Sequence, residues 1–257
     1  MVYNEDMDIR GKSIYAFVDA ANLFYGGEKS LRWRIDYEKL YKYLKEKFNV
    51  TKVFYYSGVD VEGYKEEGKE INLEKLVKYF ETELLKKEKT EAEIVLLGRH
   101  LERAKFYLDL DSFGYDLRLK PTKVFTSIEG TTTTKANCDV DLTFDMMRFM
   151  SQYNEAVVLS GDGDFAPILE YLKRKNKKIR VLARFERTAR EIKEIAGEDF
   201  VDFKSIRVEI EAEKTKKVVS HKTEIATPST PQNDKVRPQK NERRPFLKKI
   251  PIFRKGF

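Results

Sequence analysis

Short apolar runs alternate along the chain with longer amphipathic stretches, and this alternation limits the possible folds more than any other feature. Four runs are rich in β-branched or aromatic residues and are bounded by polar ones, as is typical of buried strands: 14–18, 53–56, 156–159 and 179–183. The stretches between them carry apolar residues at helical spacing. Strands that alternate with helices predict crossover connections, a mainly parallel sheet and an α/β fold.

Three further segments extend this pattern. Residues 115–119 alternate apolar and polar side chains, as a half-buried strand does. Residues 90–113 are ambiguous, because Ile94–Leu97 fits either a strand or part of a helix. Helical spacing at Ala189, Ile192 and Ile195 predicts a last helix that ends near Gly197.

The net charge of +7 is concentrated at the C-terminal end of the chain. Residues 211–257 contain 13 Lys or Arg against 5 Asp or Glu, whereas residues 1–210 contain 37 against 38. Thr, Ser, Pro, Asn and Lys dominate 214–245, and such a composition buries too little apolar surface to fold alone. The sequence therefore predicts a near-neutral folded body followed by a disordered basic tail.

The small numbers of cysteine and histidine exclude several kinds of site. One cysteine, Cys138, rules out an internal disulfide framework and a zinc cluster built on cysteines. Two histidines, His100 and His221, argue against a His-rich metal centre and a serine-type triad. No apolar run approaches the roughly 20 residues of a membrane span, and the N-terminus lacks the apolar core of a secretory signal. We expect a cytoplasmic protein.

Acidic residues follow two of the predicted strands. Asp19 ends the first strand, and strand 156–159 is followed by a glycine loop that carries Asp162 and Asp164. A third acidic segment contains Asp139. Because ligands bind at the carboxyl ends of parallel strands, the four carboxylates are expected at one edge of the sheet. Clustered carboxylates repel one another and normally hold a hard divalent cation such as Mg²⁺ or Mn²⁺.

Each of these residues also has a purely structural interpretation. An Asp after a strand is commonly a turn residue or a helix N-cap, and Asp-Gly-Asp is common in turns. Asp139 could cap the helix that carries Leu142 and Met146, and Asp141 resembles a solvated charge. Convergence of three separate segments favours a metal site, which would suit metal-assisted phosphodiester chemistry.

Three segments resemble the NYN domain, a PIN-like nuclease group that includes the LabA/DUF88 proteins: FVDAANLF, CDVDLTFDMMRFM and VVLSGDGDFAPILEYLKRKNKKIRVLA. The resemblance covers about residues 13–203 and implies a Rossmann-like three-layer α/β/α sandwich with a mainly parallel sheet. It implies an NYN/PIN-like domain at 10–207 and leaves 208–257 as the basic tail. Segment 60–113 is longer and more helical than the family leads us to expect.

The resemblance also implies roles for individual residues. The family's acidic cluster, which binds the metal and acts in catalysis, is matched by Asp19, Asp139, Asp162 and Asp164. Positions that would support this cluster are matched by Asn22, Asp145 and Ser160. Four cations are candidates for binding the phosphate backbone of the substrate: Lys120, Lys123, Lys135 and Arg184. Each is equally well interpreted as an exposed solubilising charge.

The sequence thus predicts a metal-dependent endoribonuclease that uses Mg²⁺ or Mn²⁺ to activate a water for hydrolysis of RNA phosphodiesters. One alternative is a nucleic-acid-binding or regulatory module that keeps the fold without turnover. Another is a different metal phosphotransfer enzyme such as a Toprim-like domain, which would require Glu in place of Asp19. The basic tail is expected to bind RNA in a salt-dependent way, or to contact a protein partner or a second copy.

Overall fold

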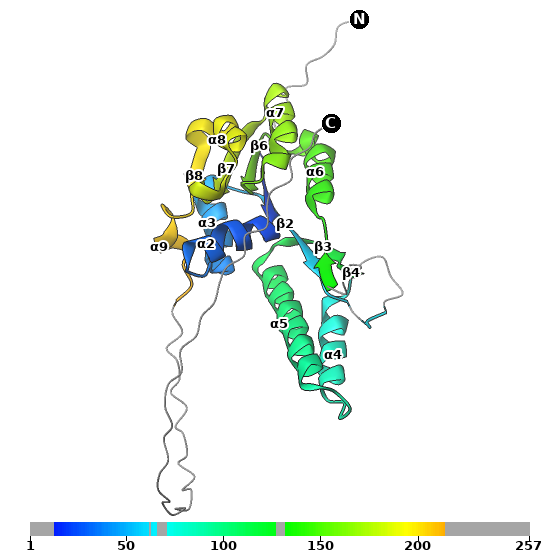
Figure 1. Ribbon diagram of the computed structural model, residues 1–257. Helices are drawn as coiled ribbons and strands as arrows, with labels where there is room; N and C mark the ends of the chain where they lie inside the picture. Colours follow the sequence, from blue (N-terminus) through cyan, green and yellow to red (C-terminus); the bar gives the residue numbers. More distant parts are fainter. Residues whose placement is uncertain (1–12, 62, 66–70, 127–131, 214–257) are drawn as a thin grey trace, which may run out of the picture. The chain divides into compact units, whose positions relative to one another are not determined.

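The computed structural model describes residues 13–61, 63–65, 71–126 and 132–213 (Figure 1). Six strands form one sheet in the order β3-β2-β1-β6-β7-β8, and every neighbouring pair is parallel. The strands are β1 (Ile14–Asp19), β2 (Lys52–Val59), β3 (Asp116–Pro121), β6 (Glu155–Leu159), β7 (Lys178–Ala183) and β8 (Phe200–Asp202). The five strands predicted from apolar pattern are therefore confirmed.

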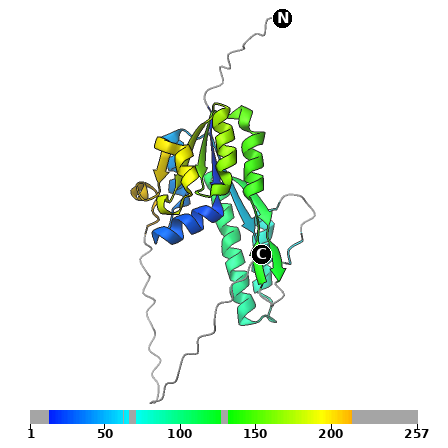
Figure 2. The ribbon, with the colours of Figure 1, turned by 45° about the horizontal axis from the view of Figure 1, so that its top comes forward.

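Helices cover both faces of the sheet, because successive side chains of each strand point to opposite faces. Ala16 and Val18 of β1 belong to one apolar core, and Tyr15 and Phe17 belong to the other. The first core includes residues of α3 (Tyr37–Phe48), α5 (Glu91–Phe113) and α9 (Arg207–Ile210). The second includes residues of α6 (Asp139–Arg148), α7 (Ala166–Arg174) and α8 (Arg190–Ala196). The predicted three-layer α/β/α sandwich is confirmed (Figure 2).

The ambiguous segment 90–113 is a helix. Helix α5 packs beside α4 (Leu73–Leu84), and together they form a helical hairpin that connects β2 to β3 along the chain (Figure 1). Thr90 and Glu93 form a capping box that starts α5, and Gly114 ends it with φ of 101°. The apolar run 94–97 resembled a strand, but its first three side chains are exposed on α5, so burial does not explain their apolar character.

Short elements complete the described part of the chain. A separate antiparallel pair is formed by β4 (Lys123–Thr126) and β5 (Thr132–Lys135). After β1 the chain continues through α1 (Ala20–Asn22), the π-helix η1 (Leu23–Glu28) and α2 (Lys29–Leu31). The 3₁₀ turns are η2 (Met150–Gln152), η3 (Gly163–Phe165), η4 (Phe185–Arg187) and η5 (Gly197–Asp199).

The folded body extends beyond residue 207, where the predicted tail begins. Ile210 of α9 is fully buried, and its carbonyl accepts a hydrogen bond from the Asp36 N–H at 2.8 Å. The Ala212 N–H donates to the Arg34 carbonyl at 2.9 Å. The described fold thus continues to residue 213, while residues 214–257 of the tail lie outside the described residues. In the part that the structure describes, no helix has the length and apolar character to cross a membrane.

Candidate active site

The carboxyl ends of β1 and β6 lie where the topology of the sheet changes direction. From β1 the chain proceeds to β2 on one side, and from β6 it proceeds to β7 on the other. Such a switch point opens a crevice beyond the strand ends, where open α/β sheets bind ligands. Val18 of β1 is in register with Leu159 of β6, so Asp19 and Ser160 emerge side by side.

Asp19 is held by two hydrogen bonds and is nearly buried, with 8% of its surface exposed. Its Oδ1 accepts the Asn22 N–H at 3.1 Å, which makes it the N-cap of α1. Its Oδ2 accepts the Ser160 hydroxyl at 3.0 Å. Burial raises the pKa of Asp19, and the nearby charge of Asp139 raises it further. The fold therefore fixes this carboxyl in a place where ionisation is costly.

The loop after β6 is hydrogen-bonded to Asn22 and Ser160, the two residues that also bond Asp19. The Asn22 side-chain oxygen accepts the Gly161 N–H at 2.9 Å, and the Ser160 hydroxyl accepts the Asp162 N–H at 3.2 Å. The Asp162 carboxylate in turn accepts the Asp164 N–H at 3.0 Å. Asn22 and Ser160 thus connect the segment of Asp19 with that of Asp162 and Asp164.

Close packing explains the glycines of this loop better than an unusual backbone conformation does. A Cβ at Gly161 would lie 2.6 Å from the Thr188 Oγ1, and one at Gly163 would lie 2.5 Å from the Glu191 Oε1. Neither glycine has a positive φ. The segment that follows β7 therefore packs directly on the loop, and the Ala189 N–H bonds the Gly161 carbonyl at 2.9 Å. Thr188 has no signal in the sequence that would have identified it.

Asp139 is the first residue of α6 and does not cap the helix, contrary to one interpretation of the sequence. The N-cap position is Cys138, and the Asp139 N–H donates to the Asn137 side-chain oxygen at 2.9 Å. Burial raises the pKa of Asp139, and the charges of Asp162 and Asp164 raise it further. Electrostatic coupling therefore joins Asp139 to both other acidic segments.

The donor chemistry of these four residues fits a hard divalent cation. Carboxylate oxygens are the ligands that Mg²⁺ and Mn²⁺ prefer, and like charges brought together are stabilised by a shared cation. Among the residues that the structure describes, no three carboxylate, imidazole or thiolate side chains are grouped closely enough to hold an ion in their present positions. Coordination of a metal by Asp19, Asp139, Asp162 and Asp164 therefore stays a prediction.

Asp145, predicted to support the acidic cluster, is bonded to residues of β2, β3 and its own helix. It is 4% exposed, and its Oδ2 accepts hydrogen bonds from the Tyr56 hydroxyl at 3.1 Å and the Arg118 Nε at 3.0 Å. Its Oδ1 pairs with Arg148 at 2.8 Å. These contacts fix α6 on β2 and β3, so Asp145 acts on the site through the helix that begins at Asp139.

The four candidate substrate cations have different surroundings. The exposed Lys120 pairs with Asp141 at 2.7 Å and also donates to the Asn137 carbonyl. Lys123 is exposed and lies opposite Lys135 in the β4–β5 pair, whereas the side chain of Lys135 lies outside the described part. Lys123 and Lys135 therefore stay candidates for binding the substrate backbone.

Arg184 requires a correction. It is 7% exposed and forms ion pairs with Asp202 and Glu186, so its guanidinium is committed to the protein interior. A buried, paired cation cannot grip a substrate backbone in the way that was predicted from its position after β7.

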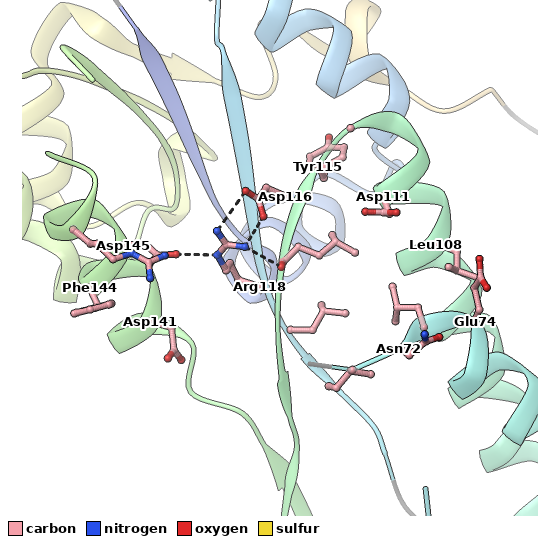
Figure 3. A pocket seen from close by; sticks show the side chains of 16 residues that line it. Asn72, Glu74, Leu108, Asp111, Tyr115, Asp116, Arg118, Asp141, Phe144 and Asp145 are labelled. Carbon is pink, nitrogen blue, oxygen red and sulfur yellow. Dashed lines mark hydrogen bonds and ion pairs between the residues drawn. The ribbon is translucent and has the colours of Figure 1, made fainter. Parts of the chain in front are cut away.

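A separate cleft of about 1230 Å³ lies along β3, between α6 and the α4–α5 hairpin (Figure 3). None of the four candidate carboxylates lines it. Arg118 bonds Asp145 of α6 and also Asp116 of its own strand, as the dashed lines in Figure 3 show. Its lining contains five acidic residues, Glu74, Asp111, Asp116, Asp141 and Asp145, against Arg118 and Arg148. Two of these carboxylates, Asp116 and Asp145, are paired with Arg118. The cleft is therefore an acidic surface distinct from the four candidate carboxylates at the switch point.

Comparisons with known proteins agree with this fold. The NYN domain family matches residues 13–209. The Low amplitude and bright protein LabA of Synechococcus elongatus is 36% identical over 104 residues, which are 40% of this chain and 55% of that protein. The chain thus matches about half the length of this relative.

A crystal structure of a protein of unknown function from Vibrio parahaemolyticus shares the fold, with a TM-score of 0.51 and 18% identity over 78% of this chain and 96% of the other. The family match says more about this chain than the shared fold does, because it spans most of the chain. Its range, residues 13–209, contains all three acidic segments. This chain belongs to the NYN domain family.

Proposed function

We propose that this protein is a metal-dependent endoribonuclease whose active site lies at the carboxyl ends of β1 and β6. Membership of the NYN family, a PIN-like nuclease group, supports a nuclease-type or RNA-related role. The observation that carries the finer proposal is the set of hydrogen bonds through Asn22 and Ser160 that joins the Asp19 carboxylate to the loop of Asp162, at a switch point of the sheet.

Asp19, Asp139, Asp162 and Asp164 would hold the metal, with Mg²⁺ or Mn²⁺ as the ions that suit their oxygens. Such an ion supplies a bound water of lowered pKa and positive charge for the transition state. The Ser160 hydroxyl orients the Asp19 carboxylate, and Asn22 holds the Gly161 backbone beside it. Asp19 and Asp139 must both be ionised to act as ligands, and burial together with neighbouring carboxylates raises the pKa of both.

Cleavage of RNA is expected to require a divalent metal and the carboxylate of Asp162. Labelled single-stranded and hairpin RNA would be incubated with the full chain in Mg²⁺ or Mn²⁺, with EDTA as the metal-free control. Asp162→Asn should lower the rate by at least about 100-fold, because it removes a metal ligand and its charge. The matched variant Asp111→Asn, an acidic residue of the cleft along β3, should cleave like the wild type.

Two outcomes would contradict the proposal. Cleavage that persists in EDTA or in Asp162→Asn would show that another nuclease is responsible. Binding of RNA without cleavage in either metal would instead favour the alternative function, a nucleic-acid-binding or regulatory module on the same fold.

A further inference from the structure

Two large aromatic side chains lie exposed immediately after the segment of Asp19. Phe24 is 47% exposed and Tyr25 is 63% exposed, and their rings contact each other edge to face with centroids 5.2 Å apart. Core rings such as Phe17 and Phe54 are almost fully buried, whereas Phe24 and Tyr25 are adjacent in the sequence and both exposed. These two rings therefore contribute little to the core.

The backbone that carries this pair is fixed to the candidate active site. The Asn22 side-chain oxygen that binds the Gly161 N–H also lies against Gly26, where a Cβ would come within 3.1 Å of it. On the inner side of the same segment, Leu23 and Gly27 are buried. The aromatic pair thus sits on a turn that is anchored on both sides.

The exposed residues of this turn form a stripe that begins two residues after Asp19. They are Ala21, Phe24, Tyr25 and Lys29. The π-helical turn η1 spans Leu23–Glu28, and such wide turns occur frequently at functional sites. The Lys29 ammonium lies 5.4 Å from the centroid of the Tyr25 ring, so a cation accompanies the aromatic surface.

We propose that Phe24 and Tyr25 form a stacking platform for unpaired bases of RNA, with Lys29 beside the phosphate backbone. The combination of exposed rings with an adjacent cation is how proteins bind single strands without reading sequence. Bases within a duplex are already stacked on their neighbours, so the platform makes the site selective for single-stranded RNA. This inference rests on the proposed function and names its substrate class.

Direct binding to a strand containing 2-aminopurine tests the platform. The full chain carrying Asp162→Asn would be titrated, in Mg²⁺, into single-stranded RNA with one internal 2-aminopurine and into a duplex of the same sequence. Stacking should quench the fluorescence of the single strand. The double variant Phe24→Leu/Tyr25→Leu should abolish the quenching and weaken single-strand binding roughly 10- to 100-fold, while duplex binding changes less than about twofold.

Two control variants separate stacking from other effects. Tyr25→Phe keeps the ring and should keep both quenching and affinity. Phe144→Leu removes a similarly exposed ring on α6, where Phe144 is 59% exposed, and should leave binding unchanged.

The outcomes also separate this inference from the proposed nuclease activity. Absence of quenching, or equal loss of single-strand and duplex affinity in the double variant, would overturn the platform. Because binding is measured in a variant without turnover, those results would leave RNA cleavage by the wild type untouched. If quenching occurs but the wild type cleaves no RNA, the platform stands and the nuclease proposal fails.

Discussion

Asp19→Asn is expected to abolish RNA cleavage without destabilising the folded protein. Asparagine can still accept the Asn22 N–H as the N-cap of α1, and Asn and Asp cap helices about equally well. The variant loses the buried negative charge that a metal ligand needs, and its amide nitrogen donates to the Ser160 oxygen where the carboxylate accepted the hydroxyl proton. We expect the cleavage rate to fall by at least about 100-fold, while the melting temperature in EDTA at neutral pH stays the same or rises.

The pH dependence of stability gives this prediction a definite sign. Burial and the charge of Asp139 raise the pKa of Asp19 above its value in the unfolded chain, so the folded protein binds this proton more tightly. The cost of the buried charge is absent below the unfolded pKa, grows as the pH rises towards the folded pKa, and is complete above it. Asp19→Asn removes that cost, so its stability relative to the wild type should increase with pH across this window.

Thermal unfolding in EDTA from about pH 4 to about pH 8, beside the cleavage assay, checks both halves of the prediction. Ser160→Ala is a useful control, because it removes the hydroxyl that bonds the Asp19 Oδ2 and retains the carboxylate itself. A marked fall in melting temperature for Asp19→Asn at neutral pH would show that the residue is mainly structural. Unchanged cleavage would remove it from the site.

Asp145→Ala should cause the largest loss of stability among single substitutions of charged residues in this region. The variant leaves the Arg118 Nε and the buried Tyr56 hydroxyl without their acceptor, and it also frees Arg148. Removing one partner of a fully buried ion pair costs roughly 3–5 kcal/mol, and here the cost should be smaller, about 2–3 kcal/mol, because Arg118 is partly exposed and keeps its pair with Asp116. Since α6 begins at Asp139, cleavage should fall as well.

Urea unfolding of three variants separates the contributions. Tyr56→Phe removes one hydrogen bond and should lower the free energy of unfolding by about 1 kcal/mol. Asp141→Ala removes an exposed ion pair with Lys120 from the same helix and should cost about 1 kcal/mol or less. If Asp145→Ala cost no more than Asp141→Ala, the network around Arg118 would not be what holds α6 on the sheet.

The sequence predicted the strands well because each one is a short apolar run bounded by polar residues. The rule that parallel strands bring their carboxyl ends to one edge predicted that Asp19 and the loop of Asp162 lie together, and Asn22 and Ser160 join these two segments, while their metal binding stays a prediction. Residues 94–97 could not be assigned from pattern alone, because a short apolar run fits both a strand and a helix. The capping box of Thr90 and Glu93 is a local signal that favoured the helix.

Contacts between distant segments account for what the sequence did not predict. No sequence pattern near Arg184 shows that Asp202 lies next to it in the fold. Arg184 was therefore predicted to be an accessible cation, whereas it is buried and paired. The partners of Asp145 come from β2 and β3. The close approach of Thr188 and Glu191 to the glycines at 161 and 163 depends on how the segment after β7 packs, which no local pattern shows.

Binding of Mn²⁺, followed by the loss of its free-ion electron paramagnetic resonance signal, tests the central claim most directly. The full wild-type chain should bind Mn²⁺ in a saturable way, and Mg²⁺ should compete for the same site. Asp19→Asn and Asp164→Asn should each bind much more weakly, while Asp111→Asn should bind like the wild type. A wild-type chain that leaves Mn²⁺ free, or carboxylate variants that bind it equally well, would contradict a metal site at the carboxyl ends of β1 and β6.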